Sequence, residues 1–306
     1  MATGRAATEN GDSCVLRSIS LRSLLFCPGD SEKKIAKAVA SGADAVIIDL
    51  EDSVAPAAKA EARDLAKATL LELRRCSIIV RVNAAETDAY LDDVALVASC
   101  VPDAIMLPKC SGPNDLRRLS SQLDVLEPAF GITRGSIGIL PLVTETAASL
   151  RSMNYAEVTE RLIALGFAGE DLASDLGVVA RSGGTFNPLL AEARRAVAMA
   201  AAAAGVAAVD TPFPDPRDPE GLMREARDAA GLGFAGKLCI HPQQIATIHA
   251  AFRPEPEQVE WGRAVIAALD NASTGVATVN GRMVDRAHLR LARRYVRSAE
   301  LEESGA

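Results

Sequence analysis

The chain has 306 residues, of which 49% are hydrophobic and 24% are charged. This is the composition of an ordinary globular protein, and it excludes collagen-like, coiled-coil and largely disordered chains. The formal net charge of −7 at pH 7 argues against a nucleic-acid-binding protein, which would present a basic face. Phosphate-bearing ligands stay compatible with this charge where lysines and arginines gather locally. Aromatic residues make up only 4%, so we expect a core of Ala, Val, Leu and Ile.

The cysteines and the first residues indicate a cytoplasmic protein. The six cysteines form no Cys-x-x-Cys pair, and most stand in apolar runs, which is typical of reduced core thiols. The run at 196–204 is apolar but too short to span a membrane, so we expect no membrane partner. Residues 1–20 lack the apolar segment of a secretory signal, and we expect them to form a flexible extension. Arg5 and Arg17 in this extension are also compatible with a transit peptide.

Eight short apolar runs along the chain predict β-strands. They are apolar throughout rather than alternating, which is typical of strands that are buried on both faces of a parallel sheet. The runs cover residues 23–27, 44–50, 77–83, 103–108, 136–144, 162–167, 206–211 and 237–241.

Charged, Ala-rich stretches with helical spacing lie between these runs. They cover residues 32–40, 59–75, 91–99, 113–124, 147–152, 188–204 and 221–231. A strand followed by a helix, repeated along the chain, predicts an α/β fold, with residues 21–252 forming a (β/α)8 TIM barrel. A doubly wound open sheet is the competing interpretation. Eight units of even length favour the closed barrel.

The chain changes character after Arg253. The sequence Arg-Pro-Glu-Pro at 253–256 interrupts the pattern, and a helix is predicted at 258–270. Asn280-Gly281 within a short β-type segment predicts a hairpin, and a basic helix is predicted at 288–297. A closed barrel does not need these elements. We therefore expect residues 253–306 to form a C-terminal lid or oligomerisation segment.

Polar side chains follow nearly every predicted strand. In a TIM barrel these positions face the mouth that holds the active site. Strand ends often carry charge because they meet water, but acids on three separate strand ends beside an arginine and a lysine favour a functional site. The residues are Asp49, Glu51, Asp52, Arg81, Asn83, Lys109, Glu145, Glu170, Asp171, Asp210 and His241.

These acids indicate a hard cation, above all Mg²⁺, which keeps several waters and needs only one or two carboxylates. A zinc site is disfavoured because none of the three histidines is spaced as a ligand pair. The sequence contains no nucleophile elbow and no P-loop.

Two cationic residues at the strand ends have alternative roles. The planar guanidinium of Arg81 suits a substrate carboxylate, or it pairs with Asp49 or Glu51 on the neighbouring strand. Lys109 could form a Schiff base, but the nearby acids favour a charged, ion-paired lysine.

Eight short motifs in order give the chain a family resemblance that covers some nine-tenths of its length. The chain resembles the citrate lyase beta-subunit-like group of the HpcH/HpaI aldolase superfamily, which includes malyl-CoA and citramalyl-CoA lyases. The motifs are Arg-Ser-Leu-Leu-Phe-Cys-Pro-Gly (22–29), Asp-Leu-Glu-Asp-Ser-Val (49–54), Arg-Val-Asn (81–83), Leu-Pro-Lys (107–109), Glu-Thr-Ala (145–147), Gly-Glu-Asp-Leu (169–172), Gly-Phe-Ala-Gly-Lys-Leu-Cys-Ile-His-Pro-Gln-Gln (233–244) and Asn-Gly-Arg-Met-Val-Asp (280–285).

The resemblance implies a (β/α)8 barrel that binds Mg²⁺ through Glu145 and Asp171. It implies that Arg81 is catalytic and holds the carboxylate of an oxo acid. Arg22 and Lys109 correspond to positions that contact the thioester ligand or the substrate acid. The acids expected to order Arg81 and metal-bound waters, without binding the metal themselves, are Asp49, Glu51 and Asp52.

The C-terminal segment gains a role from the same resemblance. In the family it forms a lid over the site of a neighbouring subunit, and Asp285 is implied as the catalytic acid or base. The resemblance also implies a homotrimer or a dimer of trimers. The stretch at 181–188 departs from the family pattern where coenzyme contacts are expected, so both coenzyme A and an acyl carrier protein stay open as the acyl carrier.

The expected function is a Mg²⁺-dependent carbon–carbon lyase. It would reversibly cleave a 3-hydroxy-3-carboxyacyl-CoA of the malyl-, citramalyl- or citryl-CoA type into acetyl-CoA and an oxo acid. The alternatives are an aldolase of free 4-hydroxy-2-oxo acids, a thioesterase or malate-synthase-like enzyme, and a non-catalytic barrel that serves as a binding subunit. The expected partners are therefore small molecules and copies of the same chain.

Overall fold

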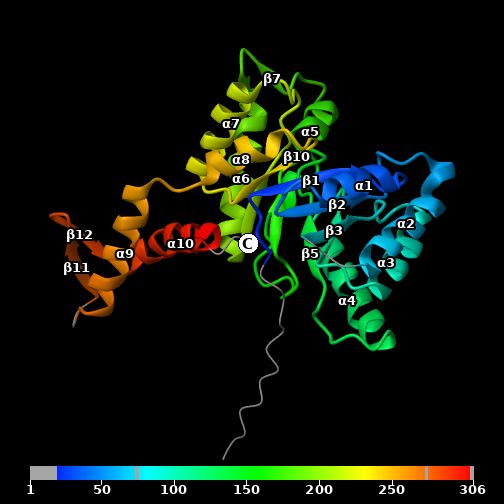
Figure 1. The fold of residues 1–306 in the computed structure, drawn as a ribbon, viewed down its shortest axis with the longest axis horizontal. Helices are drawn as coiled ribbons and strands as arrows, with labels where there is room; N and C mark the ends of the chain where they lie inside the picture. The colour runs from blue at the N-terminus through cyan, green and yellow to red at the C-terminus, as the bar shows by residue number, and fades with distance from the viewer. Residues whose placement is uncertain (1–18, 73–75, 273–274, 304–306) are drawn as a thin grey trace, which may run out of the picture.

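The computed structural model describes residues 19–72, 76–272 and 275–303. Its centre is a sheet of eight parallel strands in the order β5-β4-β3-β2-β1-β10-β9-β6 (Figure 1). Each strand overlaps one of the eight predicted runs. The strands are β1 (Ser23–Pro28), β2 (Ala45–Asp49), β3 (Ser77–Arg81), β4 (Ala104–Leu107), β5 (Gly138–Pro141), β6 (Ala164–Gly166), β9 (Ala207–Asp210) and β10 (Gly236–Cys239).

The sheet closes into a barrel where β5 meets β6. Two parallel bridges join them, Ile139 to Leu162 and Leu142 to Gly166. Glycine makes this approach possible, because a Cβ atom at Gly166 would lie 2.6 Å from the Leu142 side chain, and one at Gly138 would lie 2.9 Å from the Ile163 side chain. The structure therefore confirms the closed barrel and excludes the doubly wound open sheet.

The barrel strands are buried on both faces, as their continuous apolar runs predict. Side chains such as Ile47, Ile79 and Met106 fill the interior of the barrel. Their neighbours, including Ile48 and Val80, point outward into the larger cluster that packs against the helices. This alternation follows from the strand geometry, in which successive side chains point to opposite faces.

Six helices cover the barrel where the sequence predicts them, although their bounds differ. They are α1 (Glu32–Val39), α2 (Lys59–Leu71), α3 (Ala89–Ser99), α4 (Pro113–Ala129), α6 (Pro188–Ala204) and α7 (Pro219–Leu232). A 3-10 turn, η1 (Pro56–Ala58), precedes α2.

The structure differs from the predicted pattern in four places. The stretch predicted as a helix at 147–152 forms only the 3-10 turn η2 (Ser149–Ser152). The hairpin of β7 (Arg181–Ser182) and β8 (Thr185–Phe186) and the helices α5 (Gly169–Leu176) and α8 (Gln244–Phe252) were not predicted. The new helices have only eight and nine residues, so their apolar spacing carries little signal.

The cysteines of the described ranges are free thiols. Cys27, Cys110 and Cys239 are buried, and burial raises the pKa of each thiol to about 12. A thiol with this pKa is a weak nucleophile at neutral pH, which agrees with the predicted core role. Cys14 and the other residues at 1–18 lie outside the described residues. Within the described residues, no helix is long and apolar enough to cross a membrane.

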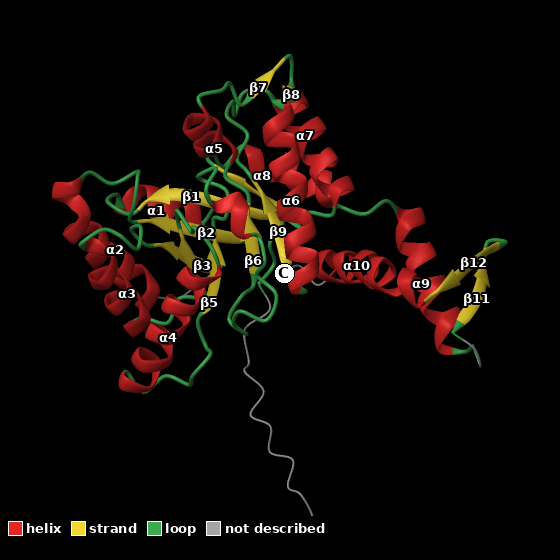
Figure 2. Cartoon of the chain, turned by 180° about the vertical axis from the view of Figure 1, so that it is seen from behind, coloured by secondary structure: helices red, strands yellow, loops and turns green. Residues whose placement is uncertain are grey.

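The C-terminal elements form an arm beside the barrel (Figures 1 and 2). The arm contains α9 (Pro256–Asp270), the hairpin of β11 (Val276–Val279) and β12 (Arg282–Asp285), and α10 (Arg286–Glu303). It has a small core of its own, which includes Val265, Val279 and Ala292. Arg290 Nη1 donates to the Ala202 carbonyl at 3.1 Å, near the C-terminal end of α6. Because α6 leads there into the start of β9, the arm attaches where the barrel strands begin, opposite the mouth.

Arg161 ties the seam strands to α4 through a buried ion pair. Its Nη1 and Nη2 atoms donate to the two carboxylate oxygens of Glu127 at 2.7 and 2.6 Å, and Nη2 also reaches Asp124 at 2.6 Å. The Glu127 side chain is fully buried and also accepts the backbone N–H groups of Gly135 and Ile137. The buried charge of Glu127 and its partner Arg161 therefore fix the segment before β6 to α4.

We expect Arg161→Gln to lower the free energy of unfolding by about 3–5 kcal/mol, because Glu127 stays buried without its cation. Urea denaturation monitored by circular dichroism measures this change. The control is Arg217→Gln, whose side chain is 87% exposed beside Asp215 and whose loss should cost less than about 0.5 kcal/mol. Equal small losses in both variants would contradict a structural role for the Arg161 pair.

Candidate active site

A cavity of about 420 Å³ opens where the barrel strands end. The strand ends bring together acids that are distant in the sequence, since Asp49, Asp52 and Asp171 all line this cavity with Arg81. Apolar side chains form the rest of its wall, among them Phe26, Leu142, Leu238 and Ile240. The cavity therefore combines a charged rim and apolar walls at the mouth where TIM-barrel enzymes carry their active sites.

Asp49 and Arg81 form a bidentate ion pair at the ends of β2 and β3. Arg81 Nε and Nη2 donate to the two Asp49 carboxylate oxygens, each at 2.7 Å. Asp49 also accepts the backbone N–H groups of Glu51 and Ser53. Burial acts to raise the pKa of Asp49, but its contacts with Arg81 outweigh burial, so this pKa lies below its usual range. The pair is a fixed, fully charged element of the cavity wall.

Arg81 is held in one orientation and still has donors to offer. Its Nη1 lies 3.2 Å from Glu51 Oε2, and the guanidinium stacks 4.9 Å above the Phe26 ring. Within the described residues, Arg81 donates two of the five N–H groups of a guanidinium, both to Asp49, whereas Glu51 Oε2 accepts no hydrogen bond. The N–H groups that Asp49 does not engage stay available for an anionic ligand in the cavity that Arg81 lines.

Lys109 joins the acids that follow β2. Its Nζ lies 2.5 Å from Glu51 Oε1 and 3.4 Å from Asp52 Oδ1. Partial burial acts to lower the pKa of Lys109, but the contacts with Glu51 and Asp52 raise it above its usual value. The amine is therefore charged at neutral pH, which disfavours a Schiff-base nucleophile. This arrangement agrees with the ion-paired alternative for Lys109.

Glu145 follows β5 and is buried, with a relative exposure of 4%. The Lys109 backbone has a φ of 50°, and in this left-handed conformation its N–H donates to Glu145 Oε2. Glu145 Oε1 is buried and has no hydrogen-bond partner among the described residues. Burial, and then the negative charges of Asp171 and Glu51, raise the pKa of Glu145 to about 8. A buried carboxylate oxygen without a partner is costly, and a bound cation would satisfy it.

Asp171 lies in the first turn of α5, directly after Glu170. The Glu170 carboxylate pairs with Arg181, whereas the Asp171 side chain lines the cavity and accepts no hydrogen bond from the described residues. The two neighbouring acids therefore differ in their partners. The negative charge of Asp171 is one of the causes of the raised pKa of Glu145.

Backbone contacts hold α5 against the segment that carries Glu145. The Ala168 N–H donates to Thr144 Oγ1 at 2.9 Å, and the Ala147 N–H donates to Asp175 Oδ2 at 2.7 Å. Together these two hydrogen bonds hold the segment that carries Glu145 and the segment that carries Asp171 against each other. The described ranges contain no group of three or more His, Cys, Asp or Glu side chains arranged as a metal cluster. A two-carboxylate site fits Mg²⁺ in particular, because this ion keeps several waters.

The structure does not bring Arg22 to the mouth. Arg22 precedes β1, and its Nε and Nη2 atoms donate to the Asp44 carboxylate, each at 2.9 Å. Asp44 likewise precedes β2, so this pair lies at the end of the barrel where the strands begin. Arg22 therefore does not reach the cavity of its own barrel, because residues before and after a strand lie at opposite ends of the barrel, and its contact with a ligand stays a prediction.

Other predicted residues have different places in the fold. His241 Nδ1 accepts the Gln243 N–H at 3.2 Å, which agrees with a structural role. Asp210 is fully buried outside the mouth, where it binds Arg194 and Lys237. Asp285 lies at the end of β12 in the arm, and its carboxylate binds His288 Nδ1 at 2.9 Å. Because the arm attaches opposite the mouth, Asp285 does not join the cavity of its own chain.

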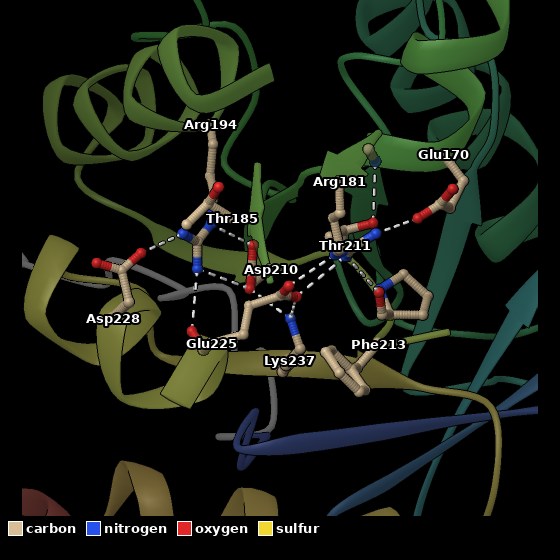
Figure 3. Close-up of polar contacts among 12 residues, drawn as sticks. Glu170, Arg181, Thr185, Arg194, Asp210, Thr211, Phe213, Glu225, Asp228 and Lys237 are labelled. Atoms are coloured by element: carbon tan, nitrogen blue, oxygen red, sulfur yellow. Dashed lines mark hydrogen bonds and ion pairs between the residues drawn. The ribbon is translucent and has the colours of Figure 1, made fainter. Parts of the chain in front are cut away.

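Reasoning from the sequence missed a buried ion network beside the cavity (Figure 3). Lys237 is fully buried, and its Nζ binds Asp210 at 2.6 Å and Glu225 at 2.8 Å. Arg194 donates through Nε to Asp210 at 2.8 Å. Two features of the sequence could have predicted this network: a lysine at the start of an apolar strand run and an arginine in an Ala-rich helix. A cation that is buried at such a position needs a buried anion as its partner.

Known proteins resemble this chain over most of its length. The family model "HpcH/HpaI aldolase/citrate lyase" matches residues 22–242. Citrate lyase subunit beta of Escherichia coli (strain K12) is 33% identical over 285 residues, which cover 92% of this chain and 93% of that protein. Mitochondrial citramalyl-CoA lyase of Mus musculus is 34% identical, and the match covers 90% of this chain and 85% of the mouse protein.

Solved structures agree with these relatives. The structure of the Mycobacterium tuberculosis protein CitE in complex with magnesium, acetoacetate and coenzyme A matches this chain with a TM-score of 0.71. It is 33% identical, and the match covers 92% of this chain and 98% of that one. With a matching family model over most of the barrel and relatives above 30% identity, the chain belongs to the HpcH/HpaI aldolase/citrate lyase family.

Proposed function

We propose that this lyase depends on Mg²⁺ and reversibly cleaves a 3-hydroxy-3-carboxyacyl-CoA of the malyl-, citramalyl- or citryl-CoA type into acetyl-CoA and an oxo acid. The observation that carries the proposal is the buried Glu145 carboxylate, which has an oxygen without a partner in the described residues and the charge of Asp171 nearby. The names of the mouse relative and of the Mycobacterium tuberculosis complex support a coenzyme A thioester.

Glu145 and Asp171 are the residues that would hold the metal. Both follow strands at the seam of the barrel, and the backbone contacts of α5 hold their segments together. When bound there, Mg²⁺ supplies positive charge that stabilises negative charge on substrate oxygens during bond cleavage. The metal would also satisfy the partnerless oxygen of Glu145 and neutralise the repulsion between the two acids.

Arg81 would bind the carboxylate of the oxo acid through the N–H groups that Asp49 does not use. Its orientation is set before the substrate arrives, because the bidentate contact with Asp49 and the Phe26 ring fix the guanidinium plane. A preorganised donor costs less free energy on binding than a mobile one. Lys109 adds a second cation for the anionic substrate, and Glu51 and Asp52 hold it in place.

Asp285 would exchange the proton at the carbon next to the thioester carbonyl. Its hydrogen bond with His288 lowers its pKa, so it is a carboxylate at neutral pH and can accept this proton in the condensing direction. In the cleavage direction Asp285 would first accept the proton that the substrate hydroxyl loses and would then deliver it to the enolate carbon. Since the arm attaches opposite the mouth of its own barrel, we propose that Asp285 serves a neighbouring subunit in a homotrimer.

We expect Glu145→Gln and Asp171→Asn each to lower lyase activity at least about 100-fold and to weaken Mg²⁺ binding, because each removes one metal-binding carboxylate. A panel of coenzyme A thioesters and free 4-hydroxy-2-oxo acids, assayed with Mg²⁺ and with a chelator, measures the activity. The control is Glu192→Gln, which changes an exposed glutamate of α6. Full activity in either site variant would contradict the metal assignment, and cleavage of the free acids alone would contradict the thioester substrate.

The raised pKa of Glu145 predicts that Mg²⁺ binding depends on pH. Below about pH 8 the metal-free Glu145 holds a proton, which the metal must displace. The apparent affinity should therefore rise up to about tenfold per pH unit between pH 6 and 8 and then level off. Calorimetry in buffers with different ionisation enthalpies should show the release of about one proton at pH 7 in the wild type, and no release at this pH would contradict the protonated Glu145.

The same pKa shift has a consequence for the stability of the metal-free protein. The ordinary pKa of a glutamic acid is 4.5, so between about pH 5 and 8 the folded state holds a proton on Glu145 that the unfolded state has lost. The Glu145 contribution to the free energy of unfolding therefore falls as the pH rises through this range. Urea denaturation in chelator should show a smaller decrease over this range for Glu145→Gln than for the wild type.

We expect Asp285→Ala and Glu145→Ala each to be inactive as pure proteins and to restore activity when they are co-expressed. A hybrid assembly contains sites with an intact Glu145 and an Asp285 from the neighbour. Random assembly should make about a quarter of the sites complete. Light scattering of the same samples gives the oligomeric state. Co-expressed variants that assemble but stay inactive would contradict a site shared between subunits.

A further inference from the structure

Arg181 begins the hairpin of β7 and β8 and lies behind the wall of the cavity. Its side chain is 11% exposed, and the guanidinium lies over the rings of Phe186 and Phe213, with 4.4 and 5.9 Å to the ring centroids. Its Nε and Nη2 atoms donate to the two carboxylate oxygens of Glu225 at 2.7 and 3.0 Å. This bidentate contact and the two rings fix the guanidinium plane.

Arg181 makes two further contacts, and Figure 3 shows the one with Glu170. Its Nη1 donates to Glu170 Oε1, and its Nη2 donates to the Pro212 carbonyl at 3.1 Å. Glu170 and Pro212 both line the cavity. One buried guanidinium therefore joins two segments of the cavity wall from behind.

The ion network gives Arg181 a rigid base. Glu225 binds Lys237, which is fully buried and also binds the fully buried Asp210. The three buried cations of the network, Arg181, Arg194 and Lys237, share two buried anions, Asp210 and Glu225. Two exposed carboxylates complete the network, Asp228 on Arg194 and Glu170 on Arg181. Of these two, Glu170 lines the cavity, so its contact with Arg181 acts on the cavity side.

Two contacts hold the start of α5 next to Asp171. The Gly169 N–H donates to Thr211 Oγ1 at 2.9 Å, and the Glu170 carboxylate is held by Arg181. Asp171 follows these two residues and accepts no hydrogen bond from the described residues. Its position is therefore set by the backbone that Thr211 and Arg181 restrain.

We infer that Arg181 is a positioning residue for the metal site: it draws the Glu170 carboxylate away from Asp171 and fixes the first turn of α5, so that Asp171 stays beside Glu145. The inference rests on the proposed function, which places the metal at Glu145 and Asp171. Without Arg181, Glu170 and Asp171 are adjacent, partly exposed acids on a turn that loses its one side-chain anchor and keeps only the contacts of Ala168 and Gly169. Metal binding then has to order this turn, and affinity falls.

The test is the Mg²⁺ dissociation constant of the full-length protein, measured by calorimetry at the same pH for every variant. We expect Arg181→Gln to raise this constant about 10–100-fold, the range typical of residues that orient metal ligands. Arg181→Lys keeps the charge but loses the bidentate fork, so it should fall between the wild type and Arg181→Gln. Saturating Mg²⁺ should restore most of the turnover of Arg181→Gln, because the ligands themselves stay intact.

A double-mutant cycle shows whether Arg181 acts through Glu170. Glu170 is 53% exposed, so we expect Glu170→Gln to fold normally and to raise the constant about threefold or more. In the double variant Arg181→Gln/Glu170→Gln the two effects should not add, since both remove the same contact. Fully additive effects would overturn the route through Glu170.

The matched control is Arg161→Gln, which removes another buried arginine with two carboxylate partners, away from the cavity. It should destabilise the fold and leave the Mg²⁺ dissociation constant of the folded protein within about twofold. Wild-type Mg²⁺ affinity in Arg181→Gln would overturn the inference. Should Arg181→Gln fail to fold, an unchanged constant in Glu170→Gln would overturn it. A wild-type protein that binds no Mg²⁺ would instead overturn the proposed function itself.

Discussion

The seam between β5 and β6 is the constraint on which the rest of this structure depends. Glycines at positions 138 and 166 let the two strands approach, and the resulting bridges close the sheet into a barrel. Glu145 follows one seam strand and Asp171 follows the other, so the same closure lets the negative charge of Asp171 contribute to the raised pKa of Glu145. Barrel closure and formation of the candidate metal site are thus one structural event.

Buried charge is distributed unevenly around the mouth, and this distribution gives the site its chemistry. Most buried acids have a cation, as Asp49 has Arg81 and Glu127 has Arg161. Glu145 has only the backbone N–H of Lys109, and its second oxygen has no partner in the described part of the chain. Networks that satisfy every charge rigidify a fold, whereas a partly satisfied acid marks a place for a ligand. The unfavourable burial of the Glu145 carboxylate is therefore found at a place where a bound cation would compensate it.

Much of the fold could be predicted because the barrel strands are apolar on both faces and because five of the six predicted helices, all except α1, have 11 residues or more. The predictions failed where the local signal was short, as for α5, α8 and the hairpin that carries Arg181. For the site, strand ends identified Glu145, Asp171 and Arg81, since the parallel topology brings all strand ends to one mouth. The same reasoning places Arg22 with Asp44 at the other end of the barrel, because Arg22 precedes its strand.

The sequence by itself determined the eight-stranded α/β pattern, the polar strand ends and the family resemblance, because these depend on local periodicity and on short motifs. Only the tertiary structure decided which charges have partners. It assigned Glu170 to Arg181, buried Asp210 with Lys237 and left one oxygen of Glu145 without a partner among the described residues. It also attached the arm with Asp285 opposite the mouth. These outcomes depend on which side chains meet across the barrel, and sequence spacing carries no information about that.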